Sequence, residues 1–166
     1  MTLTIREIEQ KDNPNIARVI RHILKEHGVD KPGTVFTDPT TDTLFEVFEH
    51  SNAYYEIVED ENSNEILGGC GIFPTDGLPD GCIELVKLYL HASTRGKGLG
   101  RTLMERSIEK AREMGFSTVY LETFPELGSA VELYRKLGFV DLNEPLGNSG
   151  HFACNMWMLK DLKGSK

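Results

Sequence analysis

The sequence predicts an α/β protein with one mixed, mostly antiparallel central sheet flanked by helices. Short apolar runs of strand composition alternate with segments whose apolar residues recur every three or four positions, as in amphipathic helices. A strand, a helix and a further strand follow one another across residues 82–123, which favours a parallel pair in the centre of the sheet. A polar turn between two other strand-like runs favours antiparallel neighbours around that pair.

Length and composition indicate a single domain covering residues 1–166. The chain has 166 residues, of which 39% are hydrophobic, enough for one sizeable core. A net charge of -8 argues against a general nucleic-acid binder. Residues 1–6 lack a signal-peptide profile and no segment is apolar enough to cross a bilayer, so we expect a soluble, cytoplasmic protein without a membrane partner. A homodimer is left open.

The first half of the chain predicts a strand over residues 3–8 and then a helix. Asn13 has the character of an N-cap, Pro14 suits the first helical position, and Gly28 suits the end of the helix. Residues 29–41 form a long polar loop with turn signals, and a second helix is expected over about residues 42–50.

Two strands over residues 53–59 and 66–73 are joined by a polar turn of hairpin type. Three glycines weaken the strand propensity of the second run: Gly68, Gly69 and Gly71. Such glycines mark a β-bulge or a close approach of another backbone.

The remaining elements are arranged around an apolar strand over residues 82–90. A turn at 91–94 and a glycine loop lead from it into a helix over about 98–114, closed by Gly115. We then expect a strand at 117–123, a short helix at 130–137, a strand from Phe139, and a last strand at 152–159.

The glycine loop has the properties of a phosphate or pyrophosphate site. Gly96, Gly98 and Gly100 let a ligand approach the main chain, and the helix that follows presents free N–H groups and the positive end of its dipole. Three cations surround this helix terminus: Arg95, Lys97 and Arg101. The spacing of the glycines fits neither a P-loop nor the dinucleotide-binding fingerprint.

Two motifs resemble those of the GCN5-related N-acetyltransferase (GNAT) superfamily. Residues 95–100, Arg-Gly-Lys-Gly-Leu-Gly after a strand, are similar to its R/Q-x-x-G-x-G/A signature. Residues 130–139 are similar to its A-x-x-L-Y-x-x-x-G-F segment, in the correct order along the chain. The resemblance covers about residues 82–140 and implies the acyl-CoA N-acyltransferase fold, with acetyl-CoA as cosubstrate.

The resemblance also implies where acetyl-CoA binds. The pantetheine would lie along the central strand, against Leu88, Tyr89 and Leu90, although Leu88 and Leu90 equally suit a core role. The pyrophosphate would lie on the glycine loop, at Arg95, Gly96, Lys97, Gly98, Leu99, Gly100 and Arg101. Leu127 stands where family members often carry Asn, a departure from the family pattern that concerns a secondary cofactor contact and not the tyrosine. The loop and helix after the first helix would help to wall the acceptor site.

The same resemblance implies two catalytic residues. Tyr134 occupies the position of the tyrosine that protonates the departing thiolate. Glu84 lies where the histone-acetylating branch places its general base, and the competing interpretation is a solvated glutamate at a strand end. Glu122 and His151 are alternative bases, whereas His91 suits an ordinary turn.

The predicted function is direct transfer of an acetyl group from acetyl-CoA to a primary amine of a small molecule or peptide, without a covalent enzyme intermediate. A non-catalytic acyl-CoA sensor and a protein-interaction module on the same fold are the alternatives. Cys70, Cys82 and Cys154 have neither disulfide nor zinc spacing, so we expect reduced thiols and no metal.

Overall fold

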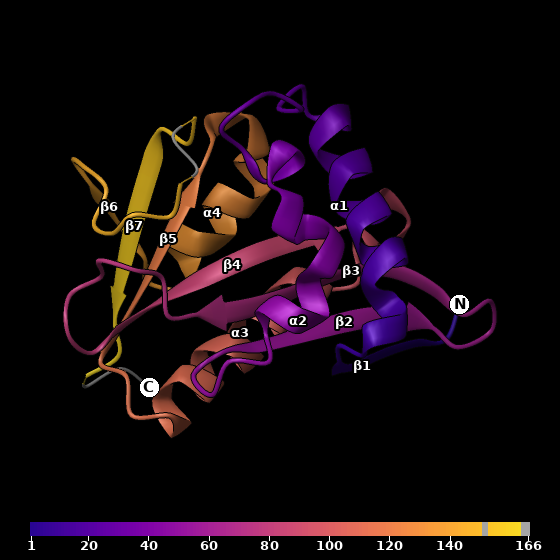
Figure 1. The fold of residues 1–166 in the computed structure, drawn as a ribbon, viewed down its shortest axis with the longest axis horizontal. Coiled ribbons are helices and arrows are strands. Elements are labelled where there is room, and N and C mark those ends of the chain that lie inside the picture. The colour runs from indigo at the N-terminus through magenta and orange to yellow at the C-terminus, as the bar shows by residue number, and fades with distance from the viewer. Residues whose placement is uncertain (151–152, 164–166) are drawn as a thin grey trace.

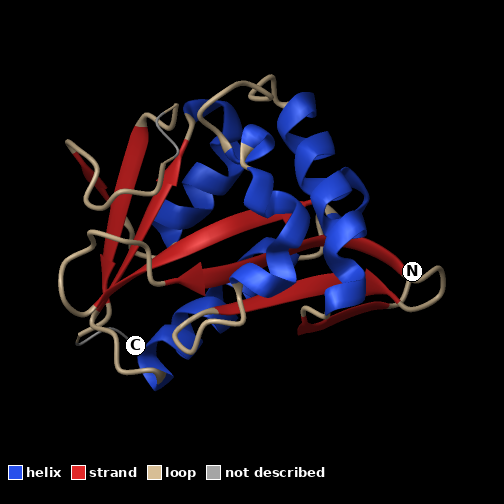
Figure 2. Ribbon diagram, viewed as in Figure 1, coloured by secondary structure: helices blue, strands red, loops and turns tan. Residues whose placement is uncertain are grey.

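In the computed structural model, which describes residues 1–150 and 153–163, seven strands form one mixed sheet (Figures 1 and 2). Their order across the sheet is β1-β2-β3-β4-β5-β7-β6, and within these described residues β4–β5 is the one parallel pair. The predicted mixed, mostly antiparallel sheet is therefore confirmed. The strands are β1 Leu3–Glu7, β2 Tyr54–Asp60, β3 Glu65–Phe73, β4 Cys82–Leu90, β5 Thr118–Thr123, β6 Val140–Leu142 and β7 Met156–Asp161.

Helices cover both faces of the sheet (Figure 1). Helices α1 (Asn13–Glu26) and α2 (Leu44–Val47) pack on one face around Ile57, whereas α3 (Leu99–Glu113) and α4 (Gly128–Lys136) pack on the other. The side chains of β2 alternate between the two cores, since Val58 packs with α3 while Ile57 packs with α1. Within the described residues, no helix combines the length and apolar character that a membrane span requires.

The first helix begins differently from the prediction. Asn13 was expected to be its N-cap, but Asp12 takes that position and Asn13 is already helical. The Asn13 side chain instead bonds to α2, accepting from the Phe45 amide at 2.8 Å and donating to Glu46 at 2.7 Å. This tertiary contact outweighs the local capping preference. The expected helix at 42–50 is only one turn, because residues 35–37 and 39–43 form 3-10 turns.

The last strand begins later than predicted. It was expected over 152–159; it is β7 Met156–Asp161, and Phe152 lies outside the described residues. Strand β5 ends at Thr123, which pairs with Met156. The residues before Met156 therefore have no β5 residue to pair with. Ala153 instead donates its amide to the carbonyl of Gly33, which joins this segment to the loop after α1.

Strands β4 and β5 pair only at their beginnings. The parallel ladder joins Cys82, Ile83 and Glu84 to Thr118, Val119 and Tyr120, and β4 then continues without this neighbour. On its other edge β4 stays paired to β3, with a register shift between Gly69 and Gly71 that confirms the predicted bulge. The two strands therefore form a fork whose open end lies beyond Glu84.

Candidate functional site

A groove of about 310 Å³ runs from the free edge of β4 to the start of α3 and to α4. It contains nine of the ten predicted cofactor-binding residues: Leu88, Tyr89, Leu90, Arg95, Gly96, Gly98, Leu99, Gly100 and Arg101. Lys97 is exposed on the same loop and does not line the groove. Residues outside the predicted set also contribute, among them Ile23 of α1 and His27, which directly follows that helix. Neither motif predicts that α1 lines the groove, because the motifs cover only residues 95–100 and 130–139.

The glycine loop adopts the conformation that an anion cradle needs. Gly96 (φ +79°) and Gly98 (φ +71°) are both left-handed, a region that other residues enter at a cost. A Cβ at either position would meet no protein atom within 4 Å, so the space beside this backbone is open. Gly98 directly precedes α3, whose first N–H groups and dipole favour an anion.

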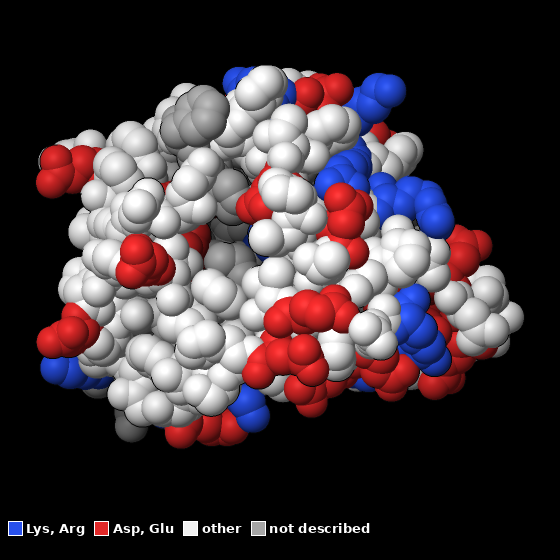
Figure 3. All heavy atoms as spheres, in the orientation of Figure 1, with Lys and Arg blue, Asp and Glu red and all other residues white. Residues whose placement is uncertain are grey.

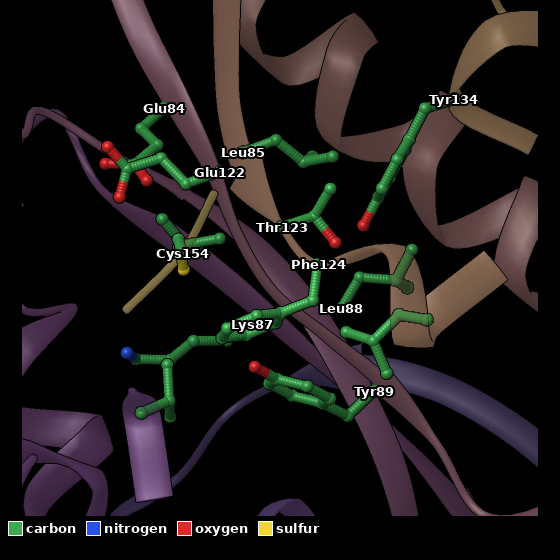
Figure 4. A pocket seen from close by; sticks show the side chains of 13 residues that line it. Glu84, Leu85, Lys87, Leu88, Tyr89, Glu122, Thr123, Phe124, Tyr134 and Cys154 are labelled. Atoms are coloured by element: carbon green, nitrogen blue, oxygen red, sulfur yellow. The ribbon is translucent and has the colours of Figure 1, made fainter. Parts of the chain in front are cut away.

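A second, smaller pocket of about 50 Å³ lies in the fork between β4 and β5 (Figure 4). It shares Leu88, Tyr89 and Leu127 with the groove, so the two spaces adjoin. Its walls bring together the predicted catalytic residues Glu84 and Tyr134 and the alternative base Glu122. These residues come from β4, α4 and β5, which are distant in sequence.

Glu84 is the last residue of β4 that pairs with β5, and it is buried with 4% exposure. The interpretation as a solvated strand-end glutamate is therefore wrong. The pKa of Glu84 is raised to about 7, and burial is the largest cause. A hydrogen bond from the Thr75 hydroxyl acts in the opposite direction, and the charge of Glu122 adds to the increase. A carboxylate with a pKa near neutrality is suited to general-base catalysis.

Glu122 lies beside Glu84, and the two carboxyl groups lie together in Figure 4. It accepts hydrogen bonds from the hydroxyls of Tyr120, at 2.7 Å, and Ser149. Figure 3 shows a hollow near the centre of the face on which α2 lies, with acidic atoms at its rim. The other predicted alternative, His151, lies outside the described residues.

Tyr134 and Thr123 supply hydroxyl groups at the opposite end of the pocket (Figure 4). Burial raises the pKa of Tyr134, so its hydroxyl retains the proton that a general acid must donate. Thr123 is 3% exposed, and its hydroxyl is the one buried side-chain polar atom of the described residues without a hydrogen-bond partner. Such orphaned groups are rare in folded proteins and commonly mark functional sites.

Sequence analysis missed three polar residues of this pocket: Lys87, Thr123 and Cys154. Lys87 did leave a signal, because it is the one cation in the apolar run at 82–90. Thr123 and Cys154 left none, since either suits a strand end. Burial raises the pKa of the Cys154 thiol to about 12, which keeps it protonated. Among the described residues, no group of three or more His, Cys, Asp or Glu side chains could hold a metal ion.

The forked sheet, the groove and the glycine loop define the acyl-CoA N-acyltransferase class of fold. The family model "Acetyltransferase (GNAT) family" matches residues 19–139, well over half of the chain. The chain therefore belongs to the GNAT acetyltransferase family and is an acyltransferase of the GNAT type.

Comparison with known proteins agrees with this assignment. The chain is 42% identical over 160 residues to the uncharacterized N-acetyltransferase YjgM of Escherichia coli (strain K12), covering 95% of this chain and 94% of that protein. A GNAT-family acetyltransferase from Staphylococcus aureus Mu50 superposes with a TM-score of 0.86 at 18% identity, over 98% of this chain and 100% of that one. YncA of Salmonella typhimurium, whose structure was solved with acetyl-CoA, superposes with a TM-score of 0.73 at 19% identity, over 99% of this chain and 96% of that one.

Proposed function

We propose that residues 1–166 form a single N-acetyltransferase domain that transfers the acetyl group of acetyl-CoA directly to a primary amine of a small molecule or peptide. The observation that carries the proposal is the fork between β4 and β5. It joins a groove that ends at an anion-binding loop to a pocket that holds a candidate base and a candidate acid. The YncA structure with acetyl-CoA shows that this fold accepts the cosubstrate.

The pantetheine of acetyl-CoA would lie along β4 beyond Glu84, where the missing neighbour leaves a strand edge open. The pyrophosphate would be bound by the backbone of residues 96–100, and Arg95 and Arg101 would neutralise part of its charge. The thioester would then lie in the pocket in the fork, close to the Tyr134 hydroxyl.

In the chemical step, the amine nitrogen attacks the thioester carbonyl carbon and the carbon–sulfur bond breaks. Glu84 accepts the proton that the amine loses, and Tyr134 donates its proton to the departing sulfur. The products are the N-acetylated amine and coenzyme A. Cys154 also lines the pocket, but its raised pKa disfavours the thiolate that a covalent acetyl-enzyme would need. Direct transfer is therefore the favoured route.

Binding is tested first, by titrating acetyl-CoA into Gly98→Ala in a calorimeter. The new Cβ occupies the open space beside the loop, so we expect Kd to rise by on the order of 10-fold. Gly115→Ala is the matched control, because Gly115 also has a positive φ (+90°) and open space but lies at the far end of α3. Equal affinities of the two variants would place the pyrophosphate elsewhere.

Catalysis is tested by free-thiol release from acetyl-CoA with a panel of primary amines. Release that depends on an amine, with one acetyl group appearing on the amine per thiol, supports the transferase. Tight binding of acetyl-CoA without thiol release on any amine would favour the acyl-CoA sensor instead.

A further inference from the structure

Lys87 is held in an unusual backbone conformation inside the pocket in the fork. It lies in the bulge of β4 and has φ +55°, a left-handed value that is rare for a residue with a side chain. Tyr55 stabilises the bulge by donating its hydroxyl to the Lys87 carbonyl at 2.8 Å. The Tyr55 ring can lie there because β3 has glycines beneath it; a Cβ at Gly69 or Gly71 would come within 2.6 Å of the ring.

The ammonium group of Lys87 has no close partner among the residues that the structure describes. Among the residues that the structure describes, no carboxylate lies within the 4.0 Å of an ion pair and no acceptor bonds to it. Burial lowers the pKa of Lys87, while the charges of Asp38 and Glu84 act in the opposite direction from a longer distance. An unpaired cation in a partly buried pocket is costly unless a ligand supplies a counter-charge.

The pocket also has an acidic wall, separate from Lys87. Glu84 is the last β4 residue paired with β5, and Glu122 lies on β5 two residues beyond its partner Tyr120. The charge of Glu122 acts on the Glu84 carboxyl, and in Figure 4 the Lys87 ammonium is drawn apart from both carboxyl groups. Both walls line the same small pocket of about 50 Å³, so a ligand that meets both walls is small and carries a positive and a negative group.

We propose that the acceptor is a small zwitterion, a free amino acid whose ammonium group meets Glu84 and Glu122 while its carboxylate binds Lys87. This inference rests on the proposed acetyl transfer and names the substrate class of that same pocket. Binding of a carboxylate to Lys87 supplies the missing counter-charge, and the two walls orient the amine toward the thioester. The distance between amine and carboxylate in the acceptor then becomes a determinant of specificity.

The competing role for Lys87 is an internal counter-charge that only tunes Glu84. Such a residue would act on every amine alike, because Glu84 accepts the proton from each of them. A carboxylate-binding residue acts only on acceptors that carry the carboxylate. Matched acceptors separate the two roles.

The experiment compares glycine, alanine and β-alanine with their carboxamides, which keep the amine and the size but lose the negative charge. Thiol release is measured for the wild type, Lys87→Met and Lys87→Arg, with Lys136→Met as the control for loss of an exposed lysine. Met keeps the apolar length of the Lys stem. Amidation lowers the pKa of the amine, so intrinsic reactivity works against the expected preference.

We expect the wild type to favour the amino acids, Lys87→Met to raise their KM by about 10- to 100-fold, and the same variant to leave the carboxamides nearly unchanged. Lys87→Arg should retain most of the preference. Equal losses on both series, or a wild type that prefers carboxamides, would overturn the proposal.

A binding measurement separates this proposal from the proposed transfer. Thermal shift of the coenzyme A-bound protein should show stabilisation by an amino acid and not by its carboxamide, and the difference should vanish in Lys87→Met. This result needs no turnover, so absence of thiol release with retained discrimination would reject the transferase alone. Equal stabilisation by the two ligand series would reject the zwitterion pocket.

Discussion

Glu56 on β2 and Glu84 on β4 are buried to a similar degree, with 2% and 4% exposure. The pKa values of their carboxyl groups nevertheless shift in opposite directions. Burial raises the pKa of both carboxyl groups. At Glu56 the hydrogen bonds from Arg106, at 2.8 and 2.6 Å, and from Tyr54, at 2.6 Å, outweigh burial and hold the pKa below its ordinary value. At Glu84 the single bond from Thr75 does not, and the pKa is about 7.

The regions around Glu56 and Glu84 also differ in whether their other buried polar groups have partners within the protein. Around β1 and β2 the buried charged residues of the described chain have partners in the protein, as when Arg6 of β1 binds the buried Asp12 before α1 with two bonds of 2.9 Å. In the fork between β4 and β5, the buried Thr123 hydroxyl has no hydrogen-bond partner among the described residues, and the half-buried Lys87 forms no ion pair with them. Polar groups satisfied within the protein stabilise the fold, whereas those left unsatisfied in a pocket are available to a ligand. Four substitutions, three of them paired with a comparison variant, test this contrast.

The largest effect is expected from Tyr134→Phe. Turnover should fall by about 10²- to 10⁴-fold, because the departing thiolate loses its proton donor. Stability should change little, since no hydrogen bond of the Tyr134 hydroxyl occurs among the described residues and the ring contact with Phe139 remains. Steady-state thiol release and thermal unfolding measure the two quantities. Near wild-type turnover on a good acceptor would remove Tyr134 from the mechanism.

Glu84→Gln should make the protein more stable at alkaline pH and less active. Between pH 4.5 and about 7 the folded state keeps a proton on Glu84 that the unfolded state has lost, so the free energy of unfolding falls as the pH rises. The total loss is about 3 kcal/mol, and Gln avoids it. Denaturant unfolding at pH 4 and pH 8 should therefore show equal stability at the lower pH and a more stable variant at the higher one.

Glu56→Gln is the matched control for that change. The pKa of Glu56 is lowered in the folded state, so its contribution is present above its ordinary pKa and is lost as the pH falls. This variant should be less stable than the wild type at pH 8, opposite to Glu84→Gln. If both variants moved in the same direction, burial alone would explain the two sites and the contrast would fail.

Arg106→Met should destabilise the fold by about 2 kcal/mol without weakening acetyl-CoA binding. The loss leaves Glu56 buried without its main partner, although water reaches the half-exposed Arg106 and moderates the effect. Arg101→Met provides the comparison: its pair with Glu105 is exposed, so stability should hardly change while acetyl-CoA affinity falls. Urea unfolding measures the stability of both variants, and calorimetry measures their affinity for acetyl-CoA.

The smallest effect is expected from Thr123→Val, which should raise stability by about 1 kcal/mol. Valine has a similar shape and removes a buried hydroxyl that lacks a partner. Thr41→Val should do the reverse, because the buried Thr41 hydroxyl donates to the Val35 carbonyl at 2.8 Å. Thermal unfolding compares the pair. Destabilisation by Thr123→Val would show that its hydroxyl is satisfied in solution.

The motifs located the glycine loop and Tyr134 along the chain, but they did not predict that Glu84 and Glu122 lie side by side. The glycine loop and Tyr134 lie within continuous segments, so their order along the chain was enough to place them. The adjacency of Glu84 and Glu122 was not predictable in the same way, because it depends on the pairing of Glu84 with Tyr120 across two strands. The last strand was misplaced for a related reason, since its start depends on where β5 ends.

By itself the sequence determined the alternation of strands and helices, the left-handed glycine loop at the start of α3, and membership of an acetyltransferase family. These follow from periodicity, from the freedom of glycine and from motifs that are local in the chain. Only the tertiary structure decided which buried polar groups have partners. Partners come from register and packing between distant segments, as Arg106 of α3 reaches Glu56 of β2 while the fork leaves Lys87 and Thr123 facing a pocket.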